Sequence, residues 1–474
     1  MICIDTEKRS FTIHTNTTTY QMGLARNNIL VHRYYGARVD DVDFGYLVLP
    51  LVLGFSGIPG DLFPDQRYSE DALPLEYSTF GLGDYRESCL DCEYENGSRG
   101  ASLRYVSHTV RAGLAVPTGL PGVYADADTG ETLEILLRDS TTGLEVVLEY
   151  GVVEKYDTIV RSARICNRTG EKVILHRALS CCLDFSVPDD RDTVIFYGKH
   201  TQERTMQRTP LSHGKFRIDS TRGASSHQYN PFWMVCDRNA DETHGSCWGL
   251  SFVYSGNFVA QAELDQLSQT RLVMGIHPQG FRWTLEDGEE FQTPQVILTH
   301  SAAGFDALSN NLHHLIREHL MRGPWRFRRP PVLVNNWEAT YFNFNEEKLF
   351  AIAQQARDIG IEMLVMDDGW FGIRNNDWTG LGDWFVNETK LKGGLKPLVE
   401  RIAGLGLKFG IWFEPEMISE DSDLFRAHPD WALTIPGRVP VRSRKQLVLD
   451  MSRADVRDYL FDAMAKILHS ADIS

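Results

Sequence analysis

The first 300 or so residues alternate apolar and polar positions in short runs typical of β-strands, for example at 144–156, 160–185 and 247–264. Turn-forming pairs such as Asn96-Gly97 and Asp287-Gly288 separate these runs. Such pairs between strand patterns predict antiparallel hairpins. The stretch is longer than one ordinary sandwich needs, so it predicts a large β-sandwich built from two sheets.

The pattern changes after Thr299. Four aliphatic residues then recur at helical spacing across 304–320 and predict an amphipathic helix: Leu308, Leu312, Leu315 and Ile316. The next segment, RGPWRFRRPP, contains three prolines and four arginines. We interpret it as a solvated linker rather than an anion site. The resulting domain prediction is a β domain at 1–302, a helical linker at 303–331 and a third part at 332–474.

The third part alternates between strand and helix patterns. Strand patterns lie at 332–337, 361–370, 407–416 and 446–450, and helical patterns lie at 345–360, 395–406 and 454–471. Strand–helix–strand units of this kind predict a parallel sheet. Apolar strands that end in polar, aromatic and acidic residues favour a βα barrel, whose chemistry lies at the C-terminal strand ends. The expected fold is therefore multidomain, β followed by α/β.

Three of these strands end with a tryptophan beside a carboxylate. The ends read Asn335-Asn336-Trp337-Glu338, Asp367-Asp368-Gly369-Trp370 and Trp412-Phe413-Glu414-Pro415-Glu416. An aromatic face suits the C–H side of a sugar ring, and carboxylates suit its hydroxyl groups. A single carboxylate at a strand end often only caps the next helix. The adjacent pair Asp367 and Asp368 cannot both do so, which favours a sugar site.

Carboxylates at barrel strand ends also bind Mg²⁺ or Mn²⁺, and five acidic residues would form such a set: Glu338, Asp367, Asp368, Glu414 and Glu416. The tryptophans would have no role at a metal, and these strand ends carry no Lys or His base. We therefore expect neither a metal nor another cofactor.

Charge and composition narrow the partners. The chain has 48 Lys and Arg against 64 Asp and Glu, a net charge of −16, and like charge disfavours nucleic acid and anionic membranes. The N-terminal sequence has no apolar core typical of a secretory signal, and no apolar run reaches the length of a membrane-spanning helix. We interpret the eight cysteines, including the Cys89–Cys92 CxxC pair, as reduced thiols of a cytoplasmic protein.

Several long motifs resemble the α-galactosidases of glycoside hydrolase family 36: EYSTFGLGDYR (76–86), NNWEATYFNFNEEKL (335–349), LVMDDGWFG (364–372), GIWFEPEMIS (410–419) and HPDW (428–431). The resemblance covers nearly the whole chain. It implies an N-terminal β-supersandwich followed by a (β/α)8 TIM barrel. It also implies metal-independent, retaining hydrolysis of terminal α-galactose from melibiose, raffinose and related oligosaccharides.

The resemblance also implies roles for individual residues. Asp367 and Asp368 match the pair that binds galactose hydroxyls, Trp337 and Trp412 match the aromatic walls of the pocket, and Arg444 matches an arginine that lines it. In tetrameric family members, an N-terminal loop of one subunit reaches over a neighbour's site. Arg67 is the candidate in that loop, and we expect a homo-oligomer for the full-length protein.

The chain departs from the family pattern near its end. In the family, the nucleophilic aspartate lies in a Lys-Trp-Asp motif after the helix matching 454–471, and the acid/base aspartate lies beyond a Cys-Ser-Gly-Gly-Gly-Gly segment. Neither motif occurs in the 474 residues. A closed barrel takes about 250 residues, and 332–474 supplies little more than half of that. We therefore expect an incomplete barrel without catalytic carboxylates, inactive by itself.

Other hypotheses stay open at this point. The chain could be a non-catalytic galactose-binding or assembly module, which would bind galactose without turning it over. A metal-dependent barrel enzyme is a third hypothesis. Related chemistry, such as α-N-acetylgalactosaminidase activity or galactosyl transfer, is also compatible with these motifs.

Overall fold

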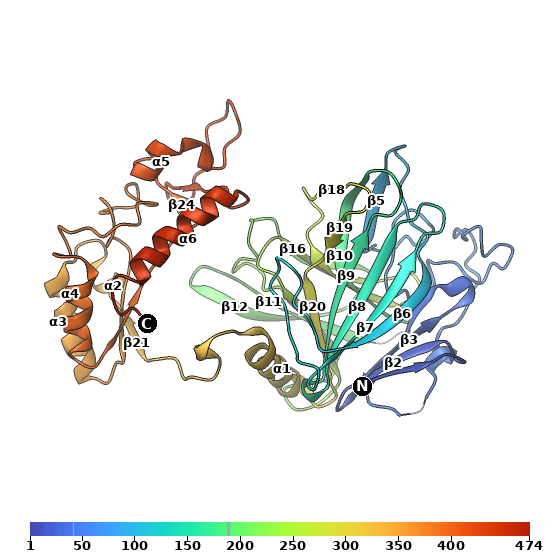
Figure 1. Ribbon diagram of the computed structural model, residues 1–474. Coiled ribbons are helices and arrows are strands. Elements are labelled where there is room, and N and C mark those ends of the chain that lie inside the picture. Colours follow the sequence, from blue (N-terminus) through green and yellow to red (C-terminus); the bar gives the residue numbers. More distant parts are fainter. Residues whose placement is uncertain (41, 187–189) are drawn as a thin grey trace. The chain divides into compact units, whose positions relative to one another are not determined.

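The chain folds into two compact units, Met1–Phe327 and Arg328–Ser474. The computed structural model describes residues 1–40, 42–186 and 190–474. The first unit is built almost entirely from β-strands, whereas the second alternates strands and helices (Figure 1). This order matches the predicted fold class, a β domain followed by α/β.

Three antiparallel sheets form the first unit. The four-stranded sheet contains β1 (Ile2–Asp5), β2 (Ser10–His14), β3 (Thr18–Leu24) and β4 (Leu30–Ala37), in that order. The six-stranded sheet contains β13 (Gly214–Ser220), β16 (Phe258–Leu264), β17 (Thr270–Ile276), β10 (Val173–Phe185) and β18 (Trp283–Leu285), with β5 (Leu90–Tyr94) also paired to β10.

The ten-stranded sheet follows the order β12 (Gln202–Pro210), β11 (Arg191–Lys199), β14 (Phe232–Asp237), β15 (Cys247–Val253), β20 (Gln295–Ser301), β9 (Thr158–Cys166), β8 (Glu145–Val153), β7 (Glu131–Arg138) and β6 (Arg104–Ala112), and β19 (Glu290–Gln292) pairs with β9. Short helices η1 (Arg26–Asn28), η2 (Phe44–Leu47) and η3 (Glu154–Tyr156) lie between strands.

One apolar core takes side chains from all three sheets, for example Tyr20, Leu148 and Leu183. The predicted strand-rich first 300 residues are thus confirmed.

A buried carboxylate, that of Glu76, connects strands of two sheets. It accepts hydrogen bonds from the hydroxyls of Tyr20 on β3 and Tyr150 on β8, each at 2.7 Å. His32 of β4 contacts it at 2.8 Å, and Arg161 of β9 pairs with it at 3.2 Å. Burial opposes ionisation of Glu76, but Arg161 and the hydrogen bonds from its neighbours outweigh burial and lower its pKa.

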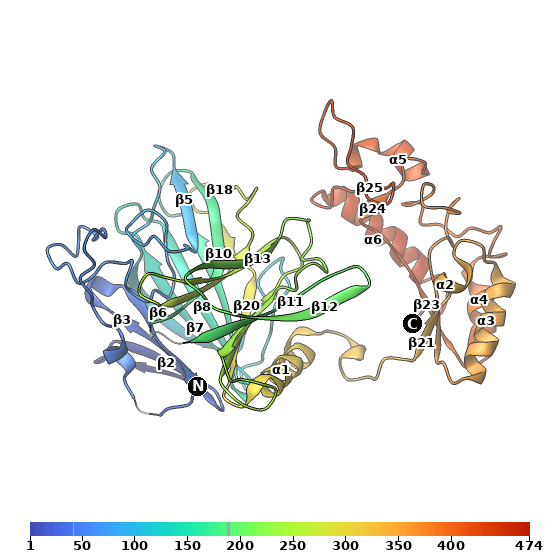
Figure 2. The ribbon, with the colours of Figure 1, turned by 180° about the vertical axis from the view of Figure 1, so that it is seen from behind.

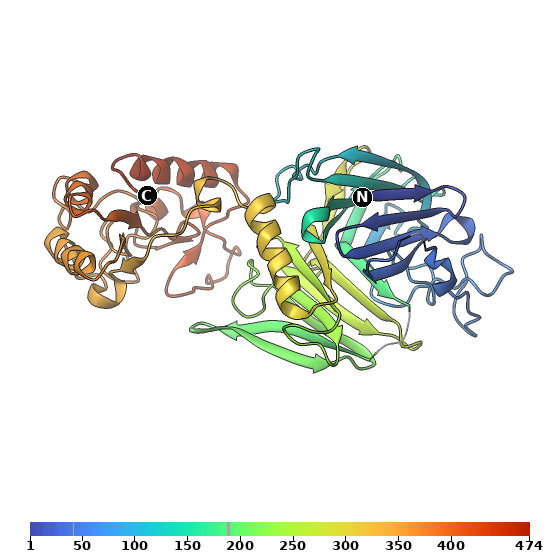
Figure 3. The same ribbon diagram turned by 90° about the horizontal axis from the view of Figure 1, so that it is seen from below.

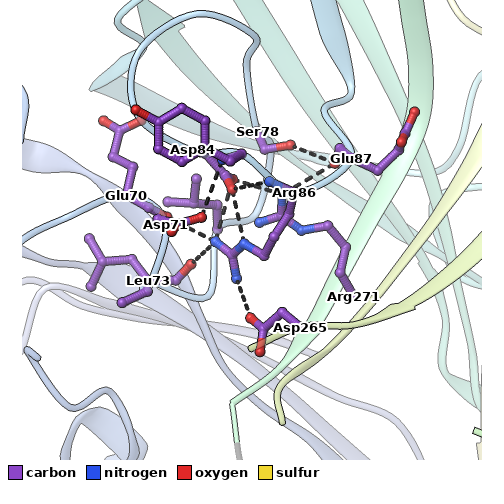
Figure 4. Close-up of polar contacts among 12 residues, drawn as sticks. Glu70, Asp71, Leu73, Ser78, Asp84, Arg86, Glu87, Asp265 and Arg271 are labelled. Carbon is purple, nitrogen blue, oxygen red and sulfur yellow. Dashed lines mark hydrogen bonds and ion pairs between the residues drawn. The ribbon is translucent and has the colours of Figure 1, made fainter. Parts of the chain in front are cut away.

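The irregular segment before β5 is fixed by buried arginines (Figure 4). Arg86 donates hydrogen bonds to the carbonyls of Glu70 and Leu73, at 2.8 and 2.7 Å, and to the carboxylate of Asp84 at 2.9 Å. Arg271 of β17 contacts the same carboxylate at 2.7 Å. Since the segment lacks a regular backbone ladder, these charge-assisted bonds hold it against the six-stranded sheet.

The helical segment expected at 304–320 is present. It consists of α1 (Gly304–Leu315) and the π-helix η4 (Ile316–Leu320), and η5 (Pro324–Arg326) follows. Helix α1 lies beside β15 and β20 of the ten-stranded sheet (Figure 3). Its Leu308, Leu312 and Leu315 are buried, as their helical spacing predicts.

The second unit contains a parallel sheet of β21 (Leu333–Asn335), β22 (Met363–Met366) and β23 (Lys408–Ile411). Helices α2 (Trp337–Thr340), α3 (Glu346–Asp358) and α4 (Leu395–Ala403) connect these strands, and α3 and α4 lie side by side (Figures 1 and 2). After β23 come β24 (Met417–Ile418), α5 (Asp423–Ala427), η6 (Pro429–Trp431), β25 (Leu447–Val448) and α6 (Ala454–Leu468).

One predicted strand is placed differently by the structure. The 446–450 run was expected to continue the parallel sheet, but its β25 pairs antiparallel with β24, with Val448 opposite Met417. Leu447 and Leu449 are buried, whereas Val448 is 39% exposed. This alternation suits a strand with one face toward solvent, while strands of a parallel sheet are covered on both faces.

All eight cysteines are free thiols, and seven of them are buried, including Cys89 and Cys92 of the CxxC pair. Within the described ranges, no helix is long and apolar enough to span a lipid bilayer.

Candidate functional site

The C-terminal ends of β21, β22 and β23 form one edge of the parallel sheet, which we call the carboxyl edge. In the parallel register, Asn335 of β21 lies opposite Val365 of β22, which lies opposite Gly410 of β23. The chain leaves each strand just beyond these positions. The carboxyl edge therefore gathers the segments that carry four residues predicted from sequence: Trp337, Asp367, Asp368 and Trp412.

Asp367 is held by two asparagines at the end of the neighbouring strand. The amide of Asn335 donates a hydrogen bond to its Oδ2 at 2.5 Å. The buried Asn336 accepts one from its backbone N–H at 2.8 Å. The side chain of Asp367 remains partly exposed, so its carboxylate keeps free lone pairs for a ligand hydroxyl.

Asp368 points into the protein and is bound by Arg374. The guanidinium donates from Nε to Oδ1 at 3.0 Å and from Nη2 to Oδ2 at 2.8 Å. The two side chains are only 3% and 0% exposed. The adjacent aspartates thus differ sharply in setting, because Asp367 faces the carboxyl edge while Asp368 belongs to a buried ion pair.

The three tryptophans of the strand ends also differ. Trp337 and Trp412 are partly exposed, and Trp337 packs edge-on against Tyr341 and Phe342 with ring centroids 5.2 and 5.1 Å away. Trp370 is fully buried, and its indole N–H donates to the carbonyl of Trp412 at 3.0 Å. Trp370 is therefore a core residue, and its predicted place in a sugar site is wrong because its ring turns into the apolar cluster.

Arg444 lies near the end of β23. Its Nη1 donates to Oε1 of Glu414 at 3.3 Å. Burial raises the pKa of Glu414, and Arg444 opposes that rise. Arg444 and Lys445 both have left-handed backbones, with φ of 49° and 64°. Non-glycine residues rarely adopt this conformation, and such strain is concentrated at functional sites.

Arg67 belongs to the first unit, where it is exposed and forms an ion pair with Asp65 at 2.8 Å. The five acidic residues considered as metal ligands do not converge. Among the residues that the structure describes, no group of three or more His, Cys, Asp and Glu side chains is placed to hold a metal ion.

Sequence reasoning missed two residues that organise this edge. Asn336 directly precedes Trp337, and an Asn-Asn pair closing a strand was the available signal. Arg374 follows Asp368 by six residues in an irregular loop. No periodicity or spacing marks it, because its partner is chosen by the path of the loop.

These features define a class of protein: a βα domain that carries aromatic rings and a partly exposed carboxylate at the ends of its strands. This combination is typical of sugar-binding sites. Comparison with known families agrees. The Melibiase family matches residues 290–474, and the glycosyl hydrolase family 36 N-terminal domain matches residues 28–286. The chain belongs to glycoside hydrolase family 36.

Several curated relatives align with the entire chain, and two of them serve as examples. The bifunctional α-galactosidase/sucrose kinase AgaSK of Mediterraneibacter gnavus is 48% identical over 472 residues, and the α-galactosidase AgaA of Geobacillus stearothermophilus is 44% identical over 474 residues. The chain spans 50% of the first protein and 65% of the second.

Solved structures agree with this relationship. The galactosidase domain of AgaSK has a TM-score of 0.97 at 48% identity, over 100% of this chain and 66% of that one. An AgaA variant from Geobacillus stearothermophilus in complex with raffinose has a TM-score of 0.95 at 45% identity, over 98% of this chain and 64% of that one.

Proposed function

We propose that this chain is part of an α-galactosidase that hydrolyses terminal α-D-galactose from oligosaccharides such as melibiose and raffinose. The observation that carries the proposal is the carboxyl edge, where the partly exposed Asp367 lies between strand ends that bear Trp337 and Trp412. The relatives named above are α-galactosidases, and one was solved with raffinose.

In this proposal the chain binds galactose and does not cleave its bond. Asp367 accepts hydrogen bonds from sugar hydroxyls. Asp368, held in place by Arg374, also binds a sugar hydroxyl. Trp337 and Trp412 form the walls of the pocket, and Arg444 lines it. Arg67 reaches the site of a neighbouring subunit in a homo-oligomer, a tetramer in the full-length protein.

The complete reaction is a retaining double displacement, which needs two carboxyl groups about 5–5.5 Å apart on opposite sides of the bond. Asp367 and Asp368 follow each other at one strand end, and Asp368 is buried with Arg374. Neither suits the nucleophile or the acid/base. We therefore expect the 474 residues alone to be inactive, with both catalytic carboxylates outside them.

We propose that the protein is located in the cytoplasm. We also propose that it needs no cofactor and binds neither nucleic acid nor membranes. The seven buried free thiols fit a reducing compartment. The net charge of −16 disfavours polyanionic partners.

A second candidate function is a non-catalytic galactose-binding or assembly module. The observation that favours it is that Asp367 and Asp368 are fixed by Asn335 and Arg374 at one strand end, which suits binding more than attack from opposite sides of a bond. Under this alternative the chain binds galactose as its complete activity.

Two assays of the purified chain test the proposal. Calorimetry should detect galactose or melibiose binding that Asp367→Ala abolishes, and p-nitrophenyl α-galactoside should not be hydrolysed. Absence of binding would contradict the sugar-site assignment. Release of p-nitrophenol would contradict the expected inactivity. Extending the chain by the missing part of the barrel should create activity under the main proposal and leave only binding under the alternative.

A further inference from the structure

Lys390 contacts the backbone of three segments that build the carboxyl edge. Its Nζ donates hydrogen bonds to the carbonyls of Phe342 at 2.9 Å, Gly369 at 2.7 Å and Arg374 at 3.2 Å. An ammonium group has three N–H donors, so the three carbonyls use its whole donor capacity. Lys390 therefore faces the protein backbone rather than a ligand.

Each carbonyl belongs to a segment that matters for the site. Gly369 directly follows Asp368, and Arg374 supplies the guanidinium that grips the Asp368 carboxylate. Phe342 follows α2, and its ring packs edge-on against Trp337. One side chain thus connects the turn that carries the aspartates with the segment that backs the aromatic wall.

The turn after Asp368 is built around this ammonium group. Gly369 has a φ of 101°, and a Cβ atom there would lie 3.0 Å from the Phe342 ring and 3.3 Å from Nζ of Lys390. Only glycine allows both the backbone conformation and the close approach. Burial lowers the pKa of Lys390 to about 8, while the nearby Asp368 opposes the fall, so the amine is mostly charged at pH 7.

Lys390 is itself fixed by its own turn. The backbone N–H of Asn387 donates to the carbonyl of Trp370 at 2.8 Å, and the carbonyl of Lys390 accepts from the N–H of Glu346 at 3.2 Å, at the start of α3. The ring of Phe344 covers the ammonium at 4.8 Å. The turn that carries the lysine is therefore anchored on one side to the loop after Asp368 and on the other to the start of α3.

We propose that Lys390 is a positioning residue for the carboxyl edge, which holds the Asp367–Asp368 turn and the segment behind Trp337 in one arrangement for sugar binding. The inference rests on the proposed sugar-binding role of those residues. It adds a residue that touches no substrate and acts through the backbone. Removing the amine leaves three buried or half-buried carbonyls without their donor, so both segments are expected to loosen together.

The test uses the 474-residue chain with Lys390→Met, which keeps the length of the side chain but has no donor, and Lys390→Arg, which restores donors. Lys396→Met is the control, because Lys396 is an exposed lysine on α4 whose ammonium pairs with Glu400 at 3.8 Å, away from both segments. Galactose affinity is measured by calorimetry. Hydrogen–deuterium exchange follows the amides of 337–344 and 368–374 against those of α3, α4 and β22.

Lys390→Met is expected to weaken galactose binding about tenfold, the effect of losing hydrogen bonds worth roughly 1–1.5 kcal/mol. It should speed exchange only in 337–344 and 368–374. Lys390→Arg should recover part of both effects, and Lys396→Met should change neither. Unchanged binding and exchange in Lys390→Met, or faster exchange throughout the second unit, would overturn the proposal.

The same experiment separates this inference from the proposed function. If the unaltered chain binds no galactoside, the sugar-site assignment fails. The exchange data still decide whether Lys390 fixes the turn. If the chain binds galactose and Lys390→Met binds equally well, only the positioning role fails.

Discussion

Arg374 binds both carboxylate oxygens of Asp368 in a buried pair whose partners are six residues apart in the chain. The arginine also donates from Nη1 to the carbonyl of Thr379 at 3.2 Å. The loop after β22 is therefore closed on itself by a guanidinium that solvent does not reach. This closure sets the direction in which Asp368 points.

Removing Arg374 should destabilise the second unit strongly. Arg374→Met leaves the Asp368 carboxylate buried without its partner, which typically costs about 3–5 kcal/mol. Urea unfolding monitored by tryptophan fluorescence measures this loss. Arg357→Met is the matched control, since Arg357 pairs with Asp358 on the surface, where a pair is worth about 1 kcal/mol or less.

A double variant tests whether the cost comes from the unpaired charge. Asp368→Asn combined with Arg374→Met removes both charges, so its free energy of unfolding should exceed that of Arg374→Met alone. Equal losses in the single and double variants would show that the arginine acts through packing instead.

Asp367→Ala should abolish measurable galactose binding and leave the fold intact. Its carboxylate is partly exposed and accepts hydrogen bonds from the Asn335 amide and the Asp368 backbone N–H, so its loss is expected to change the free energy of unfolding by about 1 kcal/mol. Calorimetry and urea unfolding of the same preparation measure the two effects. Asp358→Ala, on the exposed end of α3, is the control and should leave both unchanged.

Trp337 and Trp370 should respond to alanine in opposite ways. Trp370→Ala empties a fully buried site and should cost about 3–5 kcal/mol. Trp337→Ala should weaken galactose binding with a smaller effect on stability, because Trp337 is partly exposed at the carboxyl edge. Urea unfolding and calorimetry distinguish them. A large loss of stability in Trp337→Ala with unchanged affinity would make it a structural residue.

His300 should make the first unit sensitive to acid. It is buried on β20 beside Trp248, and burial, together with the Arg191 charge, lowers its pKa to about 4. In the unfolded chain a histidine takes up its proton near pH 6.5. Between pH 6.5 and 4 the unfolded state therefore binds more protons, and stability falls as pH falls, by about 3 kcal/mol in total.

His300→Phe should flatten this part of the stability profile in urea unfolding of the chain between pH 7 and 4. The exposed His227, substituted in the same way, serves as the control and should leave the profile unchanged. An identical acid dependence with and without His300 would rule out the histidine as its origin.

Local patterns predicted the elements, while long-range pairing stayed out of reach. The alternation of apolar and polar residues predicted β8, and apolar residues at helical spacing predicted α1. Both patterns depend only on which face of a short segment is buried. Nothing local shows that β10 pairs with β17, β5 and β18 at once. The parallel pairing predicted for 446–450 was wrong for the same reason. Its short antiparallel pairing with β24 depends on the path of the loop between the two strands.

The same limit applies to the site. Trp337 and Asp367 could be predicted because the carboxyl ends of parallel strands meet at one edge. The partners that fix that edge, Arg374 and Lys390, lie in irregular loops whose paths only tertiary packing determines. Trp370 has the same sequence context as the other strand-end tryptophans, and only its contacts with the core distinguish it.

The Glu76 carboxylate has a consequence for how the β domain unfolds. Its ligands come from β3 and β4 of one sheet and from β8 and β9 of another. Separating either sheet from the other would leave the charge of Glu76 or of Arg161 unpaired in a nonpolar interior. Partial unfolding is therefore costly, and the slowest-exchanging amides of β3, β8 and β9 should share one protection factor. The four-stranded and ten-stranded sheets then behave as one cooperative folding unit.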